Sequence, residues 1–220
     1  DVSFVIGDNN VEADLGENYR ATVNVSTGDV TIAAGNNVYY SVDGSGSLGW
    51  DSDLEEYTNT GTSQGDITIT AGIDSTDEAD DFSSDVFFNF VNVEGTQTIS
   101  IEAQSNVDGV GNIYGYLEDA YDLQSLTLTG TNAELYMFGD IGTHNSSDVF
   151  TLDLTAMTGH FTEGAAYYDP MGDSYDPVYN GDSQDNGVYV QNWDANFGNN
   201  DVVVKIGSSD LIYNAQHSEF

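Results

Sequence analysis

The segments SLTLTG (residues 125–130), ELYMFG (134–139) and VFTLDLTAMTG (149–159) follow one another along the chain, and each ends at a glycine. Apolar and polar side chains alternate along each segment, which is the period of a β-strand with one buried face. Two architectures suit short strands of this kind. One is a β-sandwich of the Greek-key or jelly-roll type, and the other is a short parallel β-solenoid with the three segments as successive rungs.

The same alternation recurs throughout the 220 residues. The best helical candidate, Leu54–Tyr57, is too short to matter. Gly, Asn, Asp and Ser fill the segments between the alternating runs and are typical of turns. We therefore expect an all-β protein. Strands are predicted over residues 3–6, 19–26, 29–34, 37–42, 66–73, 85–93, 98–103, 112–117, 125–130, 134–139, 149–156, 187–193, 201–207 and 210–215.

Spacing favours the sandwich over the solenoid. Rungs of a solenoid should repeat at a near-fixed period, but the intervals between the predicted strands vary. The acidic stretches 43–66, 74–85 and 164–187 would each be a long insertion in a rung. We therefore expect residues 9–220 to form a single β-sandwich domain with long acidic loops, including a solenoid-like segment over residues 96–160.

Residues 1–8, DVSFVIGD, form a short apolar strand ahead of a polar spacer. Folded back on its own chain, this segment would be an ordinary edge strand. Donated to a neighbouring subunit, it would complete the neighbour's sheet through backbone hydrogen bonds. Because the chain starts at Asp1 without a methionine, we also expect that an export signal has been cleaved.

The charge of the chain is strongly unbalanced. It has 38 acidic residues and two basic ones, Arg20 and Lys205, for a formal net charge of −36. Intramolecular pairing with two bases cannot offset so many acids, so salt, divalent cations or a basic partner must do so. Nucleic acid is excluded as a partner, because phosphate binding needs Lys and Arg. No apolar run has the length of a membrane span.

Calcium and salt adaptation are the two explanations of this acidity that we keep. Asp occurs 27 times and Glu 11 times, together with 20 Asn. Asp and Asn suit tight turns and short-reach metal loops, whereas a surface that only holds water can use Glu as readily. An acidic tail for a basic partner would need a contiguous acidic block, which the sequence lacks. We therefore favour Ca²⁺ bound in loops.

Four loops concentrate the candidate calcium ligands. Carboxylates crowded into one loop repel each other unless a cation lies among them. No loop matches the EF-hand pattern, so no ligand is assigned by motif. The candidate ligands are Asp43, Asp51 and Asp53; Asp74, Asp77, Asp80 and Asp81; Asp169, Asp173, Asp176, Asp182 and Asp185; and Asp194, Asn196, Asn199 and Asp201.

Sequence signals for catalysis are weak. The histidines at 144, 160 and 217 are scattered and form no metal-binding spacing, and no nucleophile signature occurs. We therefore expect a protein without catalytic residues. Aromatic residues in or beside polar loops suggest an alternative, the stacking of sugar rings. They are Tyr39, Tyr40, Trp50, Tyr57, Tyr167, Tyr168, Tyr175, Tyr179 and Trp193.

Residues 125–162 resemble the repetitive β-rich segments of bacterial surface-layer and RTX-type secreted proteins, which contain similar runs of T-L-x-L-T-G. Residues 199–214 resemble degenerate members of the same group. The resemblance implies an extracellular domain that binds calcium in its loops and assembles into lattices, adhesins or fibres. The glycine-rich nonapeptide of RTX proteins is absent, so the resemblance transfers no calcium ligand.

These observations predict an extracellular structural protein at the cell surface. Its calcium-stabilised subunits would self-assemble into a filament, surface layer or biofilm matrix, with strand donation by residues 1–7 as one means of joining. Its main partner would be a second copy of itself. The alternative is a carbohydrate-binding or adhesin module that recognises a cell-surface or matrix polysaccharide.

Overall fold

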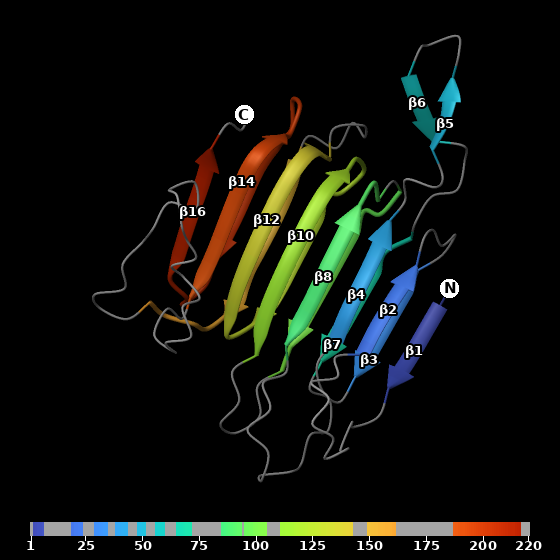
Figure 1. The fold of residues 1–220 in the computed structure, drawn as a ribbon. Helices are drawn as coiled ribbons and strands as arrows, with labels where there is room; N and C mark the ends of the chain where they lie inside the picture. Colours follow the sequence, from blue (N-terminus) through green and yellow to red (C-terminus); the bar gives the residue numbers. More distant parts are fainter. Residues whose placement is uncertain are drawn as a thin grey trace, which may run out of the picture.

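The fold is built from β-strands, as a computed structural model of the chain shows (Figure 1). Strands make up all of the regular structure in the described residues, so the all-β prediction is confirmed. No helix with the length and hydrophobicity of a membrane span occurs in that part of the chain. The structure describes residues 2–6, 19–23, 29–34, 38–43, 48–51, 56–59, 65–71, 85–93, 95–104, 111–142, 149–161 and 187–216.

The strands form two seven-stranded sheets, which we call the odd and the even sheet, and a separate two-stranded pair. The odd sheet contains β1 (Val2–Ile6), β3 (Val30–Ala34), β7 (Ile67–Ala71), β9 (Thr98–Ala103), β11 (Ser125–Gly130), β13 (Val149–Met157) and β15 (Asp201–Ile206), in that order. The even sheet contains β2 (Tyr19–Val23), β4 (Val38–Asp43), β8 (Val86–Val91), β10 (Asn112–Ala120), β12 (Asn132–Ile141), β14 (Val188–Asn196) and β16 (Leu211–Gln216). The remaining pair is β5 (Leu48–Asp51) with β6 (Glu56–Asn59).

Every pairing within the two large sheets is parallel. The predicted Greek-key or jelly-roll sandwich is therefore wrong, because those folds are built from antiparallel sheets. The chain instead alternates between the sheets, and each odd strand with the even strand that follows makes one coil. This topology fits the alternative, a parallel β-solenoid.

The core lies between the two sheets and consists of like side chains stacked from coil to coil. In the odd sheet, Ile69 pairs with Ile101, which pairs with Leu128, and all three are buried. In the even sheet, buried Phe90 and Leu117 are register partners. Parallel pairing in register places equivalent side chains beside each other, so the alternation within each strand becomes an apolar column across the coils.

The number of residues per coil varies, so the sequence shows no fixed repeat. Ile113 pairs with Ala133 in β12, whereas Ala133 pairs with the much more distant Val188 in β14. The parallel register is kept although the number of residues between paired strands differs. The pair β5–β6 lies in the connection between β4 and β7, where no strand was predicted, and Leu54–Tyr57 is not helical where the structure describes it.

Glycines lie at the ends of odd strands, as predicted for Gly130 and Gly159, whereas the predicted Gly139 lies within β12. A Cβ at Gly159 would lie 2.4 Å from the Thr131 carbonyl oxygen and 3.0 Å from the Gly187 nitrogen. A Cβ at Gly207 would lie 2.2 Å from the Thr155 carbonyl oxygen. Backbone from the adjoining coil fills these positions, so the coils approach too closely for any side chain.

Residues with left-handed backbone conformation lie at or near the C-terminal ends of four successive even strands, β8, β10, β12 and β14. Register shifts interrupt β10 and β12 at this level, so the strands bulge together before the chain leaves the sheet. Gly, Asn and Asp tolerate positive φ better than other residues. The residues are Asn92 (φ 53°), Asp119 (φ 54°), Gly139 (φ 61°) and Asp194 (φ 51°).

The corner contact at Gly159 gives a direct test of coil spacing. We expect Gly159→Ala to lower the free energy of unfolding by about 2 kcal/mol, because backbone atoms cannot move aside as a side chain would. The measurement is chemical denaturation followed by circular dichroism. Gly130→Ala is the matched control, since its Cβ would meet the nearest atom at 3.2 Å, and it should cost less. Equal losses for the two variants would contradict this packing.

Candidate functional surfaces

The two large sheets have open edges at both ends of the coil stack. β1 and β15 are the outer strands of the odd sheet, and β2 and β16 are those of the even sheet. Figure 1 shows β2 and β16 at opposite ends of the even sheet. Among the described strands, each of these four pairs on one side only. An edge strand presents backbone N–H and C=O groups to a further strand, so each end is a template for pairing. β1 pairs with β3 of its own chain.

The C-terminal coil is less buried than the coils before it. Val202, Val204, Leu211 and Tyr213 pack against the core but are only partly buried. The corresponding residues of the preceding coil, such as Leu152 and Val190, are fully buried. Inward-facing apolar side chains therefore remain partly accessible at this end, where burial by another strand pair would be favourable.

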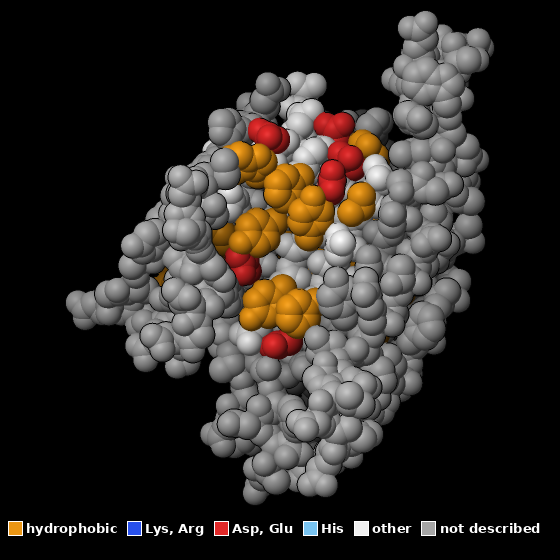
Figure 2. Space-filling model, viewed as in Figure 1, with side chains coloured by type: hydrophobic (Ala, Val, Ile, Leu, Met, Phe, Trp, Pro, Cys, Tyr) orange, Lys and Arg blue, Asp and Glu red, His pale blue; other side chains and the backbone are white. Residues whose placement is uncertain are grey.

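The outer face of the even sheet carries aromatic side chains in two rows. Register places Phe87, Tyr114 and Glu134 in one row and Asn89, Tyr116 and Tyr136 in the next. Phe87 and Tyr114 stack with ring centroids 4.6 Å apart and 11° between planes. The ring centroids of Tyr116 and Phe138 are 5.0 Å apart, and those of Tyr136 and Tyr189 are 6.3 Å apart. Figure 2 shows these groups of hydrophobic side chains with acidic side chains beside them.

Three of these tyrosine hydroxyls have a partner two residues away on the same strand. Tyr116 donates to Glu118 Oε2 at 2.8 Å, Tyr136 donates to Glu134, and Tyr189 donates to Gln191. Burial, followed by the hydrogen bond and the charge of Glu118, raises the pKa of Tyr116 to about 12. Side chains at i and i+2 share one face of a strand, so the pattern follows directly from the sequence of each strand.

A groove of about 350 Å³ lies between the two rows. Gly115, at its floor, faces inward, and its missing side chain leaves room for the buried ring of Phe88. A hollow between the aromatic groups is visible in Figure 2. The groove is lined by Phe87, Phe88, Asn89, Tyr114, Gly115, Tyr116, Glu134 and Tyr136.

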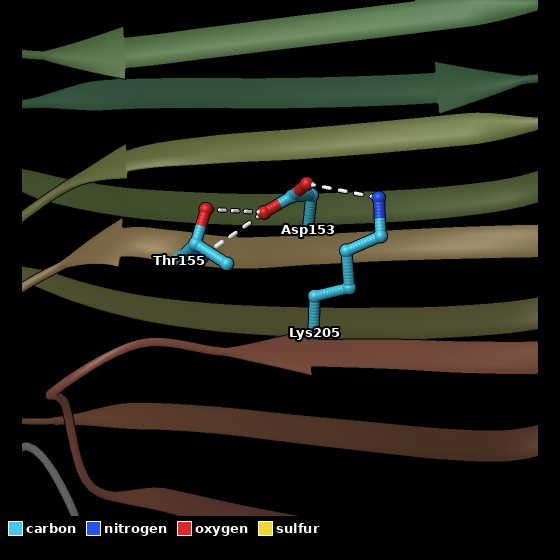
Figure 3. A network of polar contacts seen from close by, with 3 residues as sticks. All are labelled: Asp153, Thr155 and Lys205. Carbon is cyan, nitrogen blue, oxygen red and sulfur yellow. Dashed lines mark hydrogen bonds and ion pairs between the residues drawn. The ribbon is translucent and has the colours of Figure 1, made fainter.

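The outer face of the odd sheet is different in kind and carries hydroxyl side chains. One row contains, strand by strand, Thr31, Thr68, Ser100, Thr127, Asp153 and Lys205. Lys205 Nζ lies 3.3 Å from Asp153 Oδ2, and Asp153 Oδ1 accepts hydrogen bonds from the hydroxyl and amide of Thr155 (Figure 3). The hydrogen bonds from Thr155, together with Lys205, lower the pKa of Asp153. One of the two basic side chains is therefore engaged here.

Several described acids bind backbone amides of an adjacent coil. Asp66 Oδ1 accepts from the N–H of Thr98 at 2.9 Å, and Asp29 Oδ1 accepts from the N–H of Asp66 at 3.1 Å. Asp122 accepts from the N–H of Gly95 at 2.8 Å. These carboxylates satisfy amides at the coil corners, so part of the acidic content holds the coils together.

The predicted calcium ligands lie mostly outside the described residues. Those ligands are Asp53, Asp74, Asp77, Asp80, Asp81, Asp169, Asp173, Asp176, Asp182 and Asp185. Asp43 and Asp51 lie in β4 and β5 without described side chains. In the part of the chain that is described, no group of three or more His, Asp or Glu side chains could hold a metal ion.

The fourth predicted cluster is described and surrounds the turn between β14 and β15. Asn196 donates to Asp140 Oδ1 at 2.7 Å and accepts from the N–H of Gly198 at 2.8 Å. Asp194, Asn199 and Asp201 are exposed. The structure thus places Asn196 in a hydrogen-bonded turn, which is a second reason for Asx residues at this point.

The aromatic residues singled out in loops have different positions in the structure. Tyr40 is fully buried and packs edge-on against Phe90, and Trp50 pairs with Tyr57 in the β5–β6 pair. Tyr39 lies in β4 and Trp193 in β14. Tyr167, Tyr168, Tyr175 and Tyr179 are outside the described residues. Sequence reasoning missed Tyr114, Tyr116 and Tyr136, which lie within strands. The sequence did indicate their position, because the alternation that buries Ile113 and Leu135 on the inner face places these tyrosines on the outer face of the sheet.

Comparison with known proteins gives no further guide. No protein-family model, no curated protein and no solved structure matches this chain.

The raised pKa of Tyr116 can be measured residue by residue. We expect its ¹³Cζ resonance to titrate near pH 12 in the native protein. In Glu118→Gln the hydrogen bond to a carboxylate and the charge of that carboxylate are lost, so the pKa should fall, although burial and Asp119 still raise it. Glu102→Gln, on the odd sheet, is the control and should leave Tyr116 unchanged. A Tyr116 pKa near 10 in the native protein would contradict the described contact with Glu118.

Proposed function

We propose that the protein is an extracellular structural subunit, and that copies of it join end to end into a filament or surface assembly with Ca²⁺ bound in its acidic loops. The C-terminal coil of one copy would pair with the N-terminal coil of the next, continuing both sheets. All strands of a sheet run the same way, so such stacking preserves parallel pairing. A head-to-tail contact of this type repeats without closing.

The observation that carries this proposal is the partly buried apolar layer on the C-terminal coil, beside open edges of both sheets. Burial of Val202, Val204, Leu211 and Tyr213 by a neighbouring coil would add hydrophobic stabilisation to new backbone hydrogen bonds. Natural proteins usually protect such edges with charge, proline or a covering segment. In the odd sheet the described edge strand β15 carries the charged residues Asp201 and Lys205. It also carries Val203 and Ile206, which are 38% and 51% exposed.

Charge determines the conditions under which such stacking is favourable. Each copy carries a formal charge of −36, so contact between copies meets strong mutual repulsion. Divalent cations bound to loop carboxylates would lower this repulsion, and Asp and Asn supply the oxygen ligands that calcium prefers. The proposal of calcium therefore rests on composition and on the resemblance to surface-layer and RTX-type proteins.

Stacking through the C-terminal coil can be tested with lysine substitutions on the inner and the outer face of β15. We expect Val204→Lys to abolish filaments, because an inward-facing charge on an edge strand cannot be covered by another coil. Val203→Lys adds the same charge to the outer face of the same strand and should leave filaments intact. Negative-stain microscopy and sedimentation velocity provide the measurement, with circular dichroism to show that each monomer is folded. Filaments of folded Val204→Lys would refute stacking at this end.

The role of calcium is tested by removing it at constant ionic strength. We expect EGTA to dissolve the assemblies and to lower the melting temperature, and Ca²⁺ to restore both. At a free concentration one hundred times Kd, each site would contribute about 2.7 kcal/mol. Magnesium at the same concentration is the control. Assembly that ignores EGTA and follows sodium chloride concentration instead would favour salt adaptation.

A further inference from the structure

We propose that the groove on the even sheet binds a small organic cation of the quaternary or alkylated ammonium class. This inference concerns the outer face of β8, β10 and β12 and is independent of end-to-end assembly, which uses the sheet edges. It rests on the shape of the groove, the chemistry of its lining and the charge around it.

The groove offers aromatic surface on both sides. Phe87 and Tyr114, stacked on each other, belong to one row, and Tyr116 and Tyr136 belong to the other. The volume of about 350 Å³ is at the lower end for small-molecule sites. The two rows of side chains are separated by two residues along each strand. A compact ligand can therefore contact both rows at once. A cation above an aromatic ring is attracted to the electron-rich face of the ring, which is the cation–π interaction.

The electrostatic environment selects against anions. Glu134 lines the groove, and Glu118 lies beside Tyr116. Burial and the charges of Asp85 and Glu134 raise the pKa of Tyr114 to about 12, as expected where negative charge surrounds the ring. Lys205 is on the other sheet with Asp153. Arg20 lies in β2, two strands from Phe87 and four strands from Glu134 by register.

The lining favours an organic cation over a metal ion. Calcium requires six to eight oxygen ligands, and the groove has one carboxylate among mostly aromatic side chains. An alkylated ammonium group is poorly hydrated compared with a metal ion and needs no such shell. Methyl groups on nitrogen carry the positive charge to the ring surfaces, which is the arrangement of aromatic cages.

The test compares choline with 3,3-dimethyl-1-butanol, which has the same shape without the charge. At fixed sodium chloride concentration, we expect the choline methyl protons to show saturation transfer from the protein. We also expect choline to bind roughly tenfold more tightly than the neutral isostere, the ratio given by a cation–π contribution of about 1.4 kcal/mol. Equal affinity for the two probes, or binding of a neutral sugar such as cellobiose without binding of choline, would overturn the proposal.

Matched variants test whether choline binds in the groove. Glu134→Gln should weaken choline binding several-fold, whereas Glu102→Gln removes the same charge from the odd sheet and should leave it unchanged. Circular dichroism and an unchanged melting temperature of Glu134→Gln establish that the variant is folded, so that its loss of choline affinity is not a loss of structure. Equal weakening in Glu102→Gln and Glu134→Gln would show general attraction of cations to an acidic protein and would overturn the assignment to the groove.

Discussion

Parallel pairing of each strand with the strand one coil away is the constraint on which the rest of the structure depends. It fixes the register, so buried residues such as Ile69, Ile101 and Leu128 form a column between the sheets. It also sets the distance between coils at one strand spacing, about 4.8 Å. That distance leaves no room for a Cβ at corners such as Gly159. The same pairing cannot close on itself, which leaves strand edges at both ends of the stack.

The acidic residues have two distinct roles in this arrangement. At coil corners, carboxylates such as Asp66 and Asp122 accept hydrogen bonds from amides of the adjoining coil, where a negative charge is an advantage. On the even sheet, Glu118 and Glu134 accept from tyrosine hydroxyls and give the aromatic face its charge. Neither role removes the net charge of −36. Repulsion between copies therefore remains, and any assembly must overcome it with cations.

Strand positions could be predicted from the sequence because alternation reports which side chains are buried. β9 and β11 have the predicted bounds, and Gly130 and Gly159 lie at the ends of odd strands as predicted. The direction of pairing could not be predicted, since alternation is the same in parallel and antiparallel sheets. Insertions such as the one between Ala133 and Val188 concealed the repeat. The groove was missed because its residues come together only through the register of three strands.

The most direct measurement is X-ray fibre diffraction from aligned assemblies of the intact protein. If copies continue each other's sheets end to end, the strands lie across the filament, and the reflection at about 4.8 Å falls on the meridian. Reflections at that spacing on the equator would mean that strands run along the filament. Such a result would contradict end-to-end stacking and would require contacts between the faces of the sheets instead.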